Sequence, residues 1–349
     1  MRTTLDVRLV DPDAFEPGLV VDVRDEKRAL LFDLGEIDRL APRVLLRVSH
    51  AFVSHTHMDH FAGFDHLLAL GLGRMRRLAL WGGPGFVDQV EHKLRAYTWN
   101  VVHRYEVPMT IEAHAIGDDG TRTQATFDST QRFARCDGQP QVDAASAGGV
   151  AVLLDEPLFR VSACIVDHEM PVLAFAIDEK AQVRVAVDRI AAMGLATGAW
   201  LRTLKHAVLA GAPDETPIDL AWRDRGGEHA ERRSVGELRA LVLDTIPGRR
   251  IGYVTDLRST PDNVARLARL LDGVDVLHIE SVFLDRDRDH AARKNHLTAR
   301  QAGEIARRLR AKKVVPFHFS PRYRDRDESA LRDEVATWHM PCPSTCSHS

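Results

Sequence analysis

The segment 55–60 constrains this chain more than any other feature, because it places three imidazoles and one carboxylate in fixed positions: His55-Thr56-His57-Met58-Asp59-His60. An apolar run, 51–53, precedes it, and a segment typical of a helix follows. A strand that ends in such a loop directs alternate side chains to one side, so His55 and His57 can bind a first cation. The carboxylate and the third imidazole, at the turn into the helix, can bind a second. Neutral imidazole and carboxylate are ligands that zinc and manganese accept.

Composition excludes several classes of protein. With 349 residues, 44% of them hydrophobic and 28% charged, the chain can bury an ample core. Its apolar runs fall short of the ~20 residues that a membrane span needs, and its first residues lack the apolar segment of a secretory signal. We therefore expect a cytoplasmic protein that does not bind membranes. Four cysteines are too few for a disulfide scaffold. The net charge of −3 does not indicate a surface coated for nucleic acid, so charge leaves the substrate open.

Strand-like runs recur along the chain with helical segments between them, which is typical of the α/β class. The runs 19–23 and 29–35 predict a hairpin. Near the C-terminus, 298–301 fits a capping box, in which a Thr oxygen and a Gln side chain each pair with an exposed amide. A helix is expected to follow this box. The apolar run 314–317 after it predicts a further strand, directly before His318.

The domain organisation follows from where this alternation is interrupted. We expect a single domain over residues 1–335, with an inserted arm at about 180–250 that does not fold as a second domain. Residues 118–149 are polar and rich in Gly, Asp and Thr, so they predict a long surface excursion. Residues 336–349, with two of the four cysteines, are expected to form a frayed tail.

Three further polar residues follow apolar strands: His168, Asp256 and His318. In a layered α/β protein the strand ends converge on one rim, where sites are normally built. His168 adds a third imidazole for the first cation, and His318 adds a second for the other. Asp256 can bridge both cations with its two oxygens. The candidate metal ligands are therefore His55, His57, Asp59, His60, His168, Asp256 and His318.

This pattern resembles the metallo-β-lactamase superfamily, whose HxHxDH loop is reproduced at 55–60. Within it the chain is most similar to the tRNase Z family, over roughly residues 30 to 323. The pieces that carry this likeness are Trp81-Gly82-Gly83-Pro84-Gly85, Asp167-His168, Thr255-Asp256, Ile279-Glu280-Ser281-Val282-Phe283, His296-Leu297-Thr298 with Gln301-Ala302, and Phe317-His318-Phe319-Ser320-Pro321-Arg322-Tyr323.

The resemblance implies a four-layered αββα sandwich and a dinuclear zinc site, to which manganese and iron are also suited. It also implies a homodimer that trims the three-prime trailer from precursor tRNA, so RNA is the expected partner. The family's Glu and His that help protonate the leaving group match Glu280 and His296. A leaving alkoxide needs a proton, and a cationic His296 beside Glu280 is a suitable general acid. With the metal ligand Asp59, these two are the candidate catalytic residues.

The sequence also departs from the family. The tRNA enzymes usually carry Gly at the position of Met58, and Gly-Asp-Thr where this chain has Thr255-Asp256-Leu257. Their Leu-Gly-Thr-Gly loop has no counterpart in residues 1–40, and residues 193–202 keep only part of the character of the tRNA-gripping arm. These differences leave two alternatives open. One is a phosphodiesterase of the same fold that acts on cyclic nucleotides or other small phosphodiesters. The other is a metal-binding interaction protein without turnover.

Overall fold

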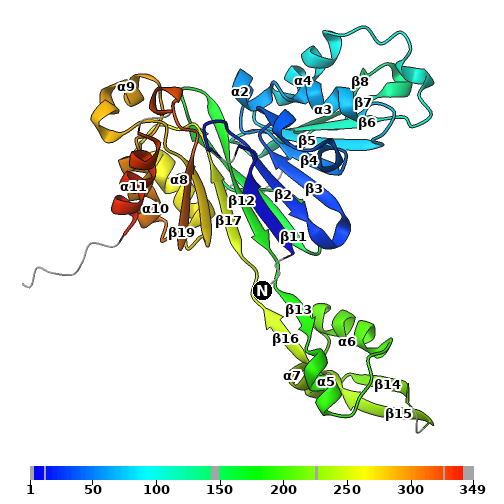
Figure 1. Ribbon diagram of the computed structural model, residues 1–349. Coiled ribbons are helices and arrows are strands. Elements are labelled where there is room, and N and C mark those ends of the chain that lie inside the picture. The colour runs from blue at the N-terminus through cyan, green and yellow to red at the C-terminus, as the bar shows by residue number, and fades with distance from the viewer. Residues whose placement is uncertain (1–3, 12, 143–148, 225–226, 325–326, 341–349) are drawn as a thin grey trace, which may run out of the picture. The chain divides into compact units, whose positions relative to one another are not determined.

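The computed structural model describes residues 4–11, 13–142, 149–224, 227–324 and 327–340 (Figure 1). The chain divides into two compact units. The first comprises Met1–Glu179 with Arg250–Ser349, and the second comprises Lys180–Arg249. Among the described residues, no helix has the length and apolar character needed to cross a membrane.

The first unit contains a nine-stranded sheet in the order β1-β2-β3-β4-β5-β6-β7-β8, with β9 paired to β7. Its four central strands, β3 to β6, are parallel, and the outer pairs are antiparallel. The bounds are β1 (Leu5–Leu9), β2 (Leu19–Val23), β3 (Arg28–Phe32), β4 (Val48–Phe52), β5 (Arg77–Gly82), β6 (Thr110–Ile116), β7 (Thr121–Asp128), β8 (Ala134–Asp137) and β9 (Gln141–Val142). The hairpin expected from the first two apolar runs is β2–β3.

A second sheet of six strands has the order β10-β11-β12-β17-β18-β19. Strands β17, β18 and β19 are parallel to one another, and β10, β11, β12 and β17 pair antiparallel. The bounds are β10 (Ala151–Asp155), β11 (Phe159–Asp167), β12 (Pro171–Glu179), β17 (Arg250–Val254), β18 (Val276–Glu280) and β19 (Lys313–Phe317). The long interval between β12 and β17 is the second unit of the chain.

The two sheets pack face to face, with helices on both outer faces (Figure 1). Alternation along β3 explains the layering, because Leu30 and Phe32 face the second sheet while Leu31 faces the helices. The Phe32 ring lies 5.3 Å from that of Phe175 in β12. The helices are α1 (Pro42–Leu45), α2 (Met58–Phe61), α3 (Phe64–Gly71) and α4 (Phe86–Arg95) on one side, and α8 (Pro261–Leu271), α9 (Arg288–Arg293), α10 (Ala299–Arg308) and α11 (Glu328–His339) on the other. This is the expected four-layered αββα sandwich.

Local sequence signals set the helix ends. Helix α10 begins at the predicted capping box, with the Thr298 hydroxyl accepting from the Gln301 amide and the Gln301 side chain accepting from the Thr298 amide. Helix α8 follows the N-cap Thr260 and has Pro261 at its first turn. Because α10 leads directly into β19, this cap also helps to fix the place of His318.

The second unit has the bounds of the expected arm, and it has its own buried cluster, whereas the sequence predicted an arm that does not fold as a second domain. Two antiparallel strand pairs and three helices form it: β13 (Gln182–Val185) with β16 (Leu243–Ile246), β14 (Pro217–Asp224) with β15 (Gly227–Ser234), and α5 (Val187–Ala192), α6 (Trp200–Leu209) and α7 (Val235–Val242). Ile218 and Leu220 alternate along β14 and are buried with Leu204 of α6 and Leu238 of α7. This alternation is short and directly precedes the charged segment 223–233, so the sequence pattern does not indicate a buried strand here.

Two smaller expectations also need correction. The segment 118–149 is not only a surface excursion, since β7, β8 and β9 extend the first sheet. Residues 143–148 lie outside the described part. The tail does not begin at 336, because α11 continues to His339 with Leu331 and Val335 buried. Residues 341–349, which hold two cysteines, lie outside the described residues.

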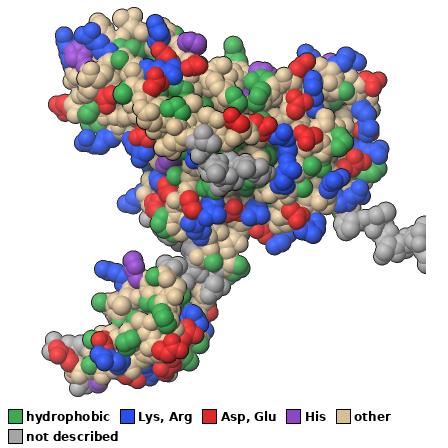
Figure 2. Space-filling view, turned by 180° about the vertical axis from the view of Figure 1, so that it is seen from behind, with side chains coloured by type: hydrophobic (Ala, Val, Ile, Leu, Met, Phe, Trp, Pro, Cys, Tyr) green, Lys and Arg blue, Asp and Glu red, His purple; other side chains and the backbone are tan. Residues whose placement is uncertain are grey.

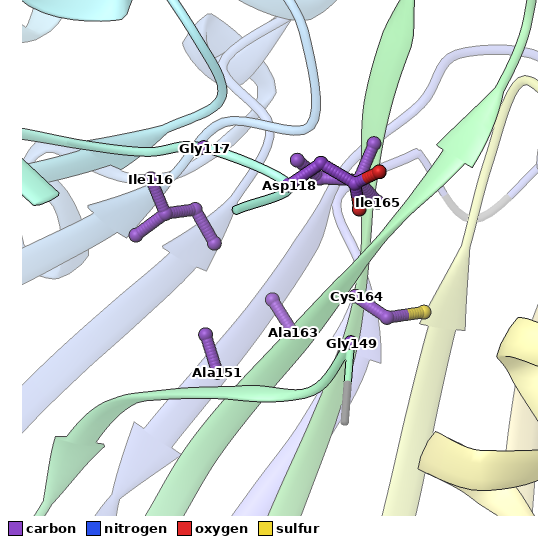
Figure 3. A pocket seen from close by; sticks show the side chains of 8 residues that line it. All are labelled: Ile116, Gly117, Asp118, Gly149, Ala151, Ala163, Cys164 and Ile165. Atoms are coloured by element: carbon purple, nitrogen blue, oxygen red, sulfur yellow. The ribbon is translucent and has the colours of Figure 1, made fainter. Parts of the chain in front are cut away.

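Cys164 in β11 is one of the residues that line a small hollow with Ile116 and Ala163, and its sulfur points away from those two side chains (Figure 3). Burial raises the pKa of its thiol to about 12, so Cys164 stays protonated and packs as a small apolar residue. On the face of the molecule shown in Figure 2, Lys and Arg side chains are interspersed with Asp and Glu. No single-sign tract marks that face, which agrees with the neutral balance of the sequence.

Candidate metal centre

The loop between β4 and α2 carries the first four candidate ligands. His57 is the N-cap of α2 and has extended backbone angles, so the chain turns sharply after it. Two backbone hydrogen bonds join this segment to Leu34. The Leu34 amide donates to the His60 carbonyl at 2.7 Å, and the Gly63 amide donates to the Leu34 carbonyl at 2.6 Å. A Cβ added at Gly35 would lie 2.2 Å from the Asp59 carbonyl oxygen. This close approach requires glycine at position 35.

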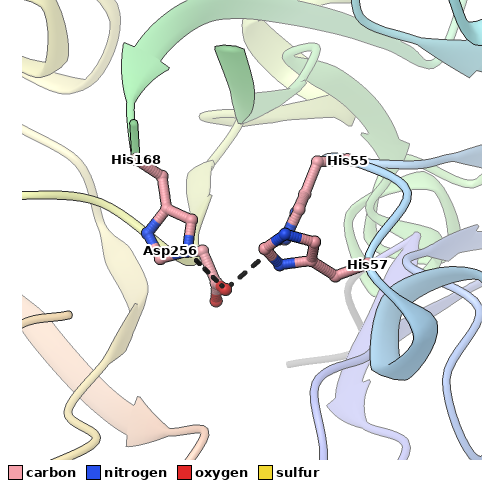
Figure 4. Close-up of side chains that lie close together, drawn as sticks. All are labelled: His55, His57, His168 and Asp256. Atoms are coloured by element: carbon pink, nitrogen blue, oxygen red, sulfur yellow. Dashed lines mark ion pairs between the residues drawn. The ribbon is translucent and has the colours of Figure 1, made fainter. Parts of the chain in front are cut away.

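One group of ligand atoms comes from three loops. His55, His57, His168 and Asp256 each offer one atom, and these atoms lie within 4.8 Å of one another. The Asp256 Oδ2 atom is 3.6 Å from His55 Nε2 and 3.6 Å from His168 Nε2. Figure 4 shows the carboxylate between His168 on one side and His55 and His57 on the other. The strand ends therefore converge as the sequence predicts.

A second group lies against the other oxygen of the same carboxylate. Asp59, His60 and His318 offer atoms that lie within 4.8 Å of one another. His318 Nε2 is 3.3 Å and His60 Nε2 is 3.4 Å from Asp59 Oδ2. Asp256 Oδ1 is 3.5 Å from His60 Nε2 and 3.0 Å from His318 Nδ1. Asp256 thus presents one oxygen to each group, which is the geometry of a bridging ligand.

The chemistry of these atoms fits divalent cations. His55 Nε2, His60 Nε2 and His318 Nδ1 are buried and have no hydrogen-bond partner within the described residues. A buried polar atom without a hydrogen-bond partner lowers the stability of the fold by about 1–3 kcal/mol. Three such atoms in one cluster therefore indicate that a bound group normally contacts them. Burial lowers the pKa of His55 to about 3, which keeps its imidazole neutral and able to bind a metal. Cations between these nitrogens and the carboxylates would satisfy all three.

Outer partners fix the orientation of the imidazoles. Asp33 is fully buried after β3, and its Oδ2 atom accepts from His60 Nδ1 at 2.8 Å. The same carboxylate accepts from the Ser54 amide and hydroxyl and from the Tyr253 hydroxyl. His168 Nδ1 donates to the Asn295 carbonyl at 2.9 Å. Each contact directs the Nε2 atom of its histidine toward the ligand groups.

Sequence reasoning missed the role of Asp33. A signal was present, because a carboxylate that ends an apolar strand is costly to bury and needs several donors. The positions of its donors, from three separate segments, could not be read from the sequence.

The pair Glu280–His296 lies beside the two groups. Glu280, the last residue of β18, is fully buried, and its Oε2 atom accepts from His296 Nδ1 at 2.7 Å. Its Oε1 atom accepts from the amides of Leu257 and Leu297, which fixes the carboxylate. Burial lowers the pKa of His296, but the charge and hydrogen bond of Glu280 and the charge of Asp256 together outweigh burial, so the net pKa is raised. The ring lies 5.6 Å from His318 and 5.0 Å from His168.

A cleft of about 410 Å³ opens beside His296 and His318. Its wall includes the aromatic residues Phe15 and Phe283, and Arg322, whose guanidinium lies 5.1 Å from the centre of the Phe283 ring. A space lined by aromatic and cationic groups next to the ligand groups can receive a substrate with rings and negative charge.

The chain is similar to several known proteins. Residues 217–319 match the model of the beta-lactamase superfamily domain. A ribonuclease Z of Deinococcus radiodurans is 32% identical over 301 residues, which are 85% of this chain and 84% of the relative. The chain belongs to the ribonuclease Z family. A ribonuclease Z of Thermobifida fusca is also 32% identical, over 90% of this chain and 82% of that protein.

Solved structures agree on the fold of this ribonuclease Z family member. The short form of human tRNase Z superposes with a TM-score of 0.53 at 19% identity, covering 90% of each chain. The metallo-β-lactamase fold protein YhfI from Bacillus subtilis gives a TM-score of 0.50 at 14% identity, covering 95% of this chain and 91% of that one. Together with the family, the His/Asp cluster identifies a metal-dependent hydrolase of the tRNase Z-like endoribonuclease type that binds divalent metal.

Proposed function

We propose that this protein hydrolyses a phosphodiester bond in precursor tRNA and so releases the three-prime trailer. The observation that carries the proposal is the place of the Glu280–His296 pair, 2.7 Å apart and beside the two ligand groups that share Asp256. A proton donor at this place suits a reaction whose leaving group is a poorly stabilised alkoxide. The relatives named ribonuclease Z, which match most of the chain, support the same substrate.

The proposed centre holds two zinc ions. His55, His57 and His168 would hold one ion, Asp59, His60 and His318 would hold the other, and Asp256 would be shared by both. Bound divalent cations supply Lewis-acid polarisation of the phosphodiester and activation of the attacking water.

The chain's own residues then perform the remaining tasks. Asp33 keeps His60 oriented, and Glu280 holds the ring of His296 through Nδ1. The free Nε2 atom of a cationic His296 is the proton donor to the leaving oxygen. Because Glu280 is buried and fixed by two amides, it holds His296 in one position while the proton moves. Phe283 and Arg322 in the adjoining cleft would contact the RNA near the scissile bond.

We also propose that the protein acts as a homodimer, as the likeness to tRNase Z implied, and that it does so in the cytoplasm, as its sequence led us to expect. Its total mass in solution, measured by light scattering, tests the first part: twice the chain mass is expected, and the mass of one chain contradicts it.

The function is tested by offering the zinc-loaded protein a precursor tRNA and bis-p-nitrophenyl phosphate in parallel. We expect cleavage of the precursor at one site after the acceptor stem. The rate at low substrate concentration should fall steeply with added salt, because binding releases counterions from the RNA. Hydrolysis of the small diester should change little with salt. A protein that hydrolyses the small diester and leaves the precursor uncut is instead a small-molecule phosphodiesterase, and the proposal is then wrong.

A further inference from the structure

Three loops that carry site residues meet at one side chain. His168 follows β11, Asp256 follows β17, and His296 precedes α10. Asn295 stands directly before His296, and its carbonyl accepts the Nδ1 proton of His168 at 2.9 Å. One residue therefore contacts a candidate metal ligand through its backbone and adjoins the candidate proton donor in the sequence.

The Asn295 side chain is held from both sides. Its Oδ1 atom accepts from Arg258 Nε at 2.9 Å, and its Nδ2 atom donates to Glu169 Oε2 at 2.8 Å. Arg258 belongs to the loop of Asp256, and Glu169 to the loop of His168. The amide thus uses its acceptor on one loop and its donor on the other.

Further contacts make these two loops rigid. Arg258 Nη2 lies 3.4 Å from Glu169 Oε2, and Nη1 donates to Asp167 Oδ2 at 3.2 Å. Asn263, fully buried in α8, accepts from the Asp167 amide and donates to the carbonyls of Asp167 and Arg258. The frame on which Asn295 rests is therefore fixed by a buried amide as well as by the partly exposed ion pairs.

The backbone of Asn295 explains why an asparagine suits this place. Its φ angle is 61°, in the left-handed region that asparagine tolerates better than most residues. In this conformation the carbonyl reaches His168 while the next residue, His296, turns toward Glu280. Glycine also adopts this conformation, so Asn295→Gly removes the side-chain contacts without adding backbone strain.

We propose that Asn295 is a positioning residue that locks the loop of the proton donor His296 to the metal ligand His168, through its side-chain bonds to Arg258 and Glu169. The role in proton donation rests on the function proposed above, whereas the role toward His168 does not. Asn295 touches neither reacting atom, and acts by fixing the distance and the angle between the two rings, whose centres are 5.0 Å apart.

The first test measures zinc affinity by competition with a coloured chelator. Outer partners of metal ligands typically change metal affinity or activity by about 10–100-fold, so Asn295→Gly should weaken one of two zinc sites by about 10-fold. Asn100→Gly, which removes the same atoms from an exposed loop, is the matched control and should bind both ions as the wild type does. Wild-type zinc affinity at both sites in Asn295→Gly overturns the proposal for His168.

The second test is single-turnover cleavage of precursor tRNA. Asn295→Gly should lower the rate constant at saturating RNA by about 10-fold, at the lower end for an outer partner, with little change in KM. Hydrolysis of bis-p-nitrophenyl phosphate at saturating zinc should fall less, because its leaving group needs no proton. An equal loss on both substrates overturns the link to His296. If the wild type itself leaves the RNA uncut, the proposed function fails, while the zinc affinities still decide the role toward His168.

A rescue experiment separates positioning from simple destabilisation. Asn295→Asp places a carboxylate against Glu169 and should impair zinc binding, because the two like charges repel. Adding Glu169→Gln restores a donor–acceptor pair with the same total charge as the wild type, so zinc affinity should recover. No recovery overturns the proposal. Arg258→Met provides a variant that leaves position 295 unchanged, and should weaken zinc binding in the same direction as Asn295→Gly.

Discussion

Asp33 and His60 stand 27 positions apart in the sequence, and the carboxylate Oδ2 of the first lies 2.8 Å from Nδ1 of the second inside the protein. This contact assigns the Nδ1 proton of His60 to Asp33 and leaves Nε2, which has no partner in the described chain, for a cation. The ligand properties of His60 are thus set by a residue from another strand.

Asp33→Asn is therefore expected to weaken zinc binding by about 10–100-fold, the usual effect of losing an outer carboxylate. An amide at this place can donate to Nδ1, which moves the ring proton to Nε2 and blocks the metal. Zinc affinity, measured against a chelator, checks this. Asp38→Asn makes the same change at an exposed position and should leave affinity unchanged. Equal affinities in Asp33→Asn and wild type would show that Asp33 has no role in metal binding.

His296→Ala should lower cleavage of precursor tRNA by about 10²–10⁴-fold, the usual contribution of a general acid. The activated diester bis-p-nitrophenyl phosphate should lose far less, since its leaving group departs without a proton. Single-turnover rates on both substrates measure the difference. A comparable loss on both would mean that His296 acts by holding the site together.

The pH dependence of tRNA cleavage should report the pair Glu280–His296. Burial lowers the pKa of His296, but the charge and hydrogen bond of Glu280 and the charge of Asp256 together raise it by more, so the cationic acid is present at low pH and is lost as pH rises through the raised pKa. Glu280→Gln removes the raising charge and leaves the burial. The alkaline limb of kcat should therefore move to lower pH. An unmoved limb would assign it to another group.

Removal of metal should destabilise the fold, because three buried nitrogens that have no hydrogen bond within the described residues would lose the cation beside them. Zinc that binds only the folded chain at 100 times its Kd stabilises it by about 2.7 kcal/mol per site. Thermal unfolding with zinc and with excess chelator measures this, with magnesium as a control that imidazoles bind poorly. Identical melting temperatures in zinc and in chelator would contradict a cation at these nitrogens.

Gly35→Ala should damage both stability and metal binding. The new Cβ would lie 2.2 Å from the Asp59 carbonyl oxygen, so the loop that carries Asp59 and His60 must shift. Overpacking of this kind typically costs about 1–3 kcal/mol, which urea unfolding would detect. Gly83→Ala is the control, since its Cβ would meet only a Leu173 carbon at 4.0 Å. A wild-type unfolding curve for Gly35→Ala would show that the loop adapts at no cost.

The candidate ligands were easier to predict from the sequence than the residues that orient them. His168, Asp256 and His318 were predicted to converge because each follows an apolar strand, and the structure places all three beside the loop 55–60. Their roles as ligands stay a prediction until metal is bound. Asp33 and Asn295 were not singled out, because their importance depends on contacts between loops far apart in the sequence.

The fold shows the same division. The αββα layers follow from alternation in strands such as β3 and from the capping box of α10, which are local signals. The buried cluster of the second unit is hard to predict because Ile218 and Leu220 form only a short alternation, just before the charged segment 223–233. Strands β7 and β8 were missed because their side chains are mostly polar or exposed, and pairing with a neighbour decides their structure.

The candidate ligands follow strands of two different sheets. His55 to His60 follow β4 of the first sheet, whereas His168, Asp256 and His318 follow strands of the second. Neither half of the sandwich can assemble the proposed centre alone, so high-affinity capture of the two proposed ions would wait until the two sheets have docked. During refolding, the time course of zinc binding would then report the time course of sheet docking. It would also distinguish completed molecules from those in which only one sheet has formed.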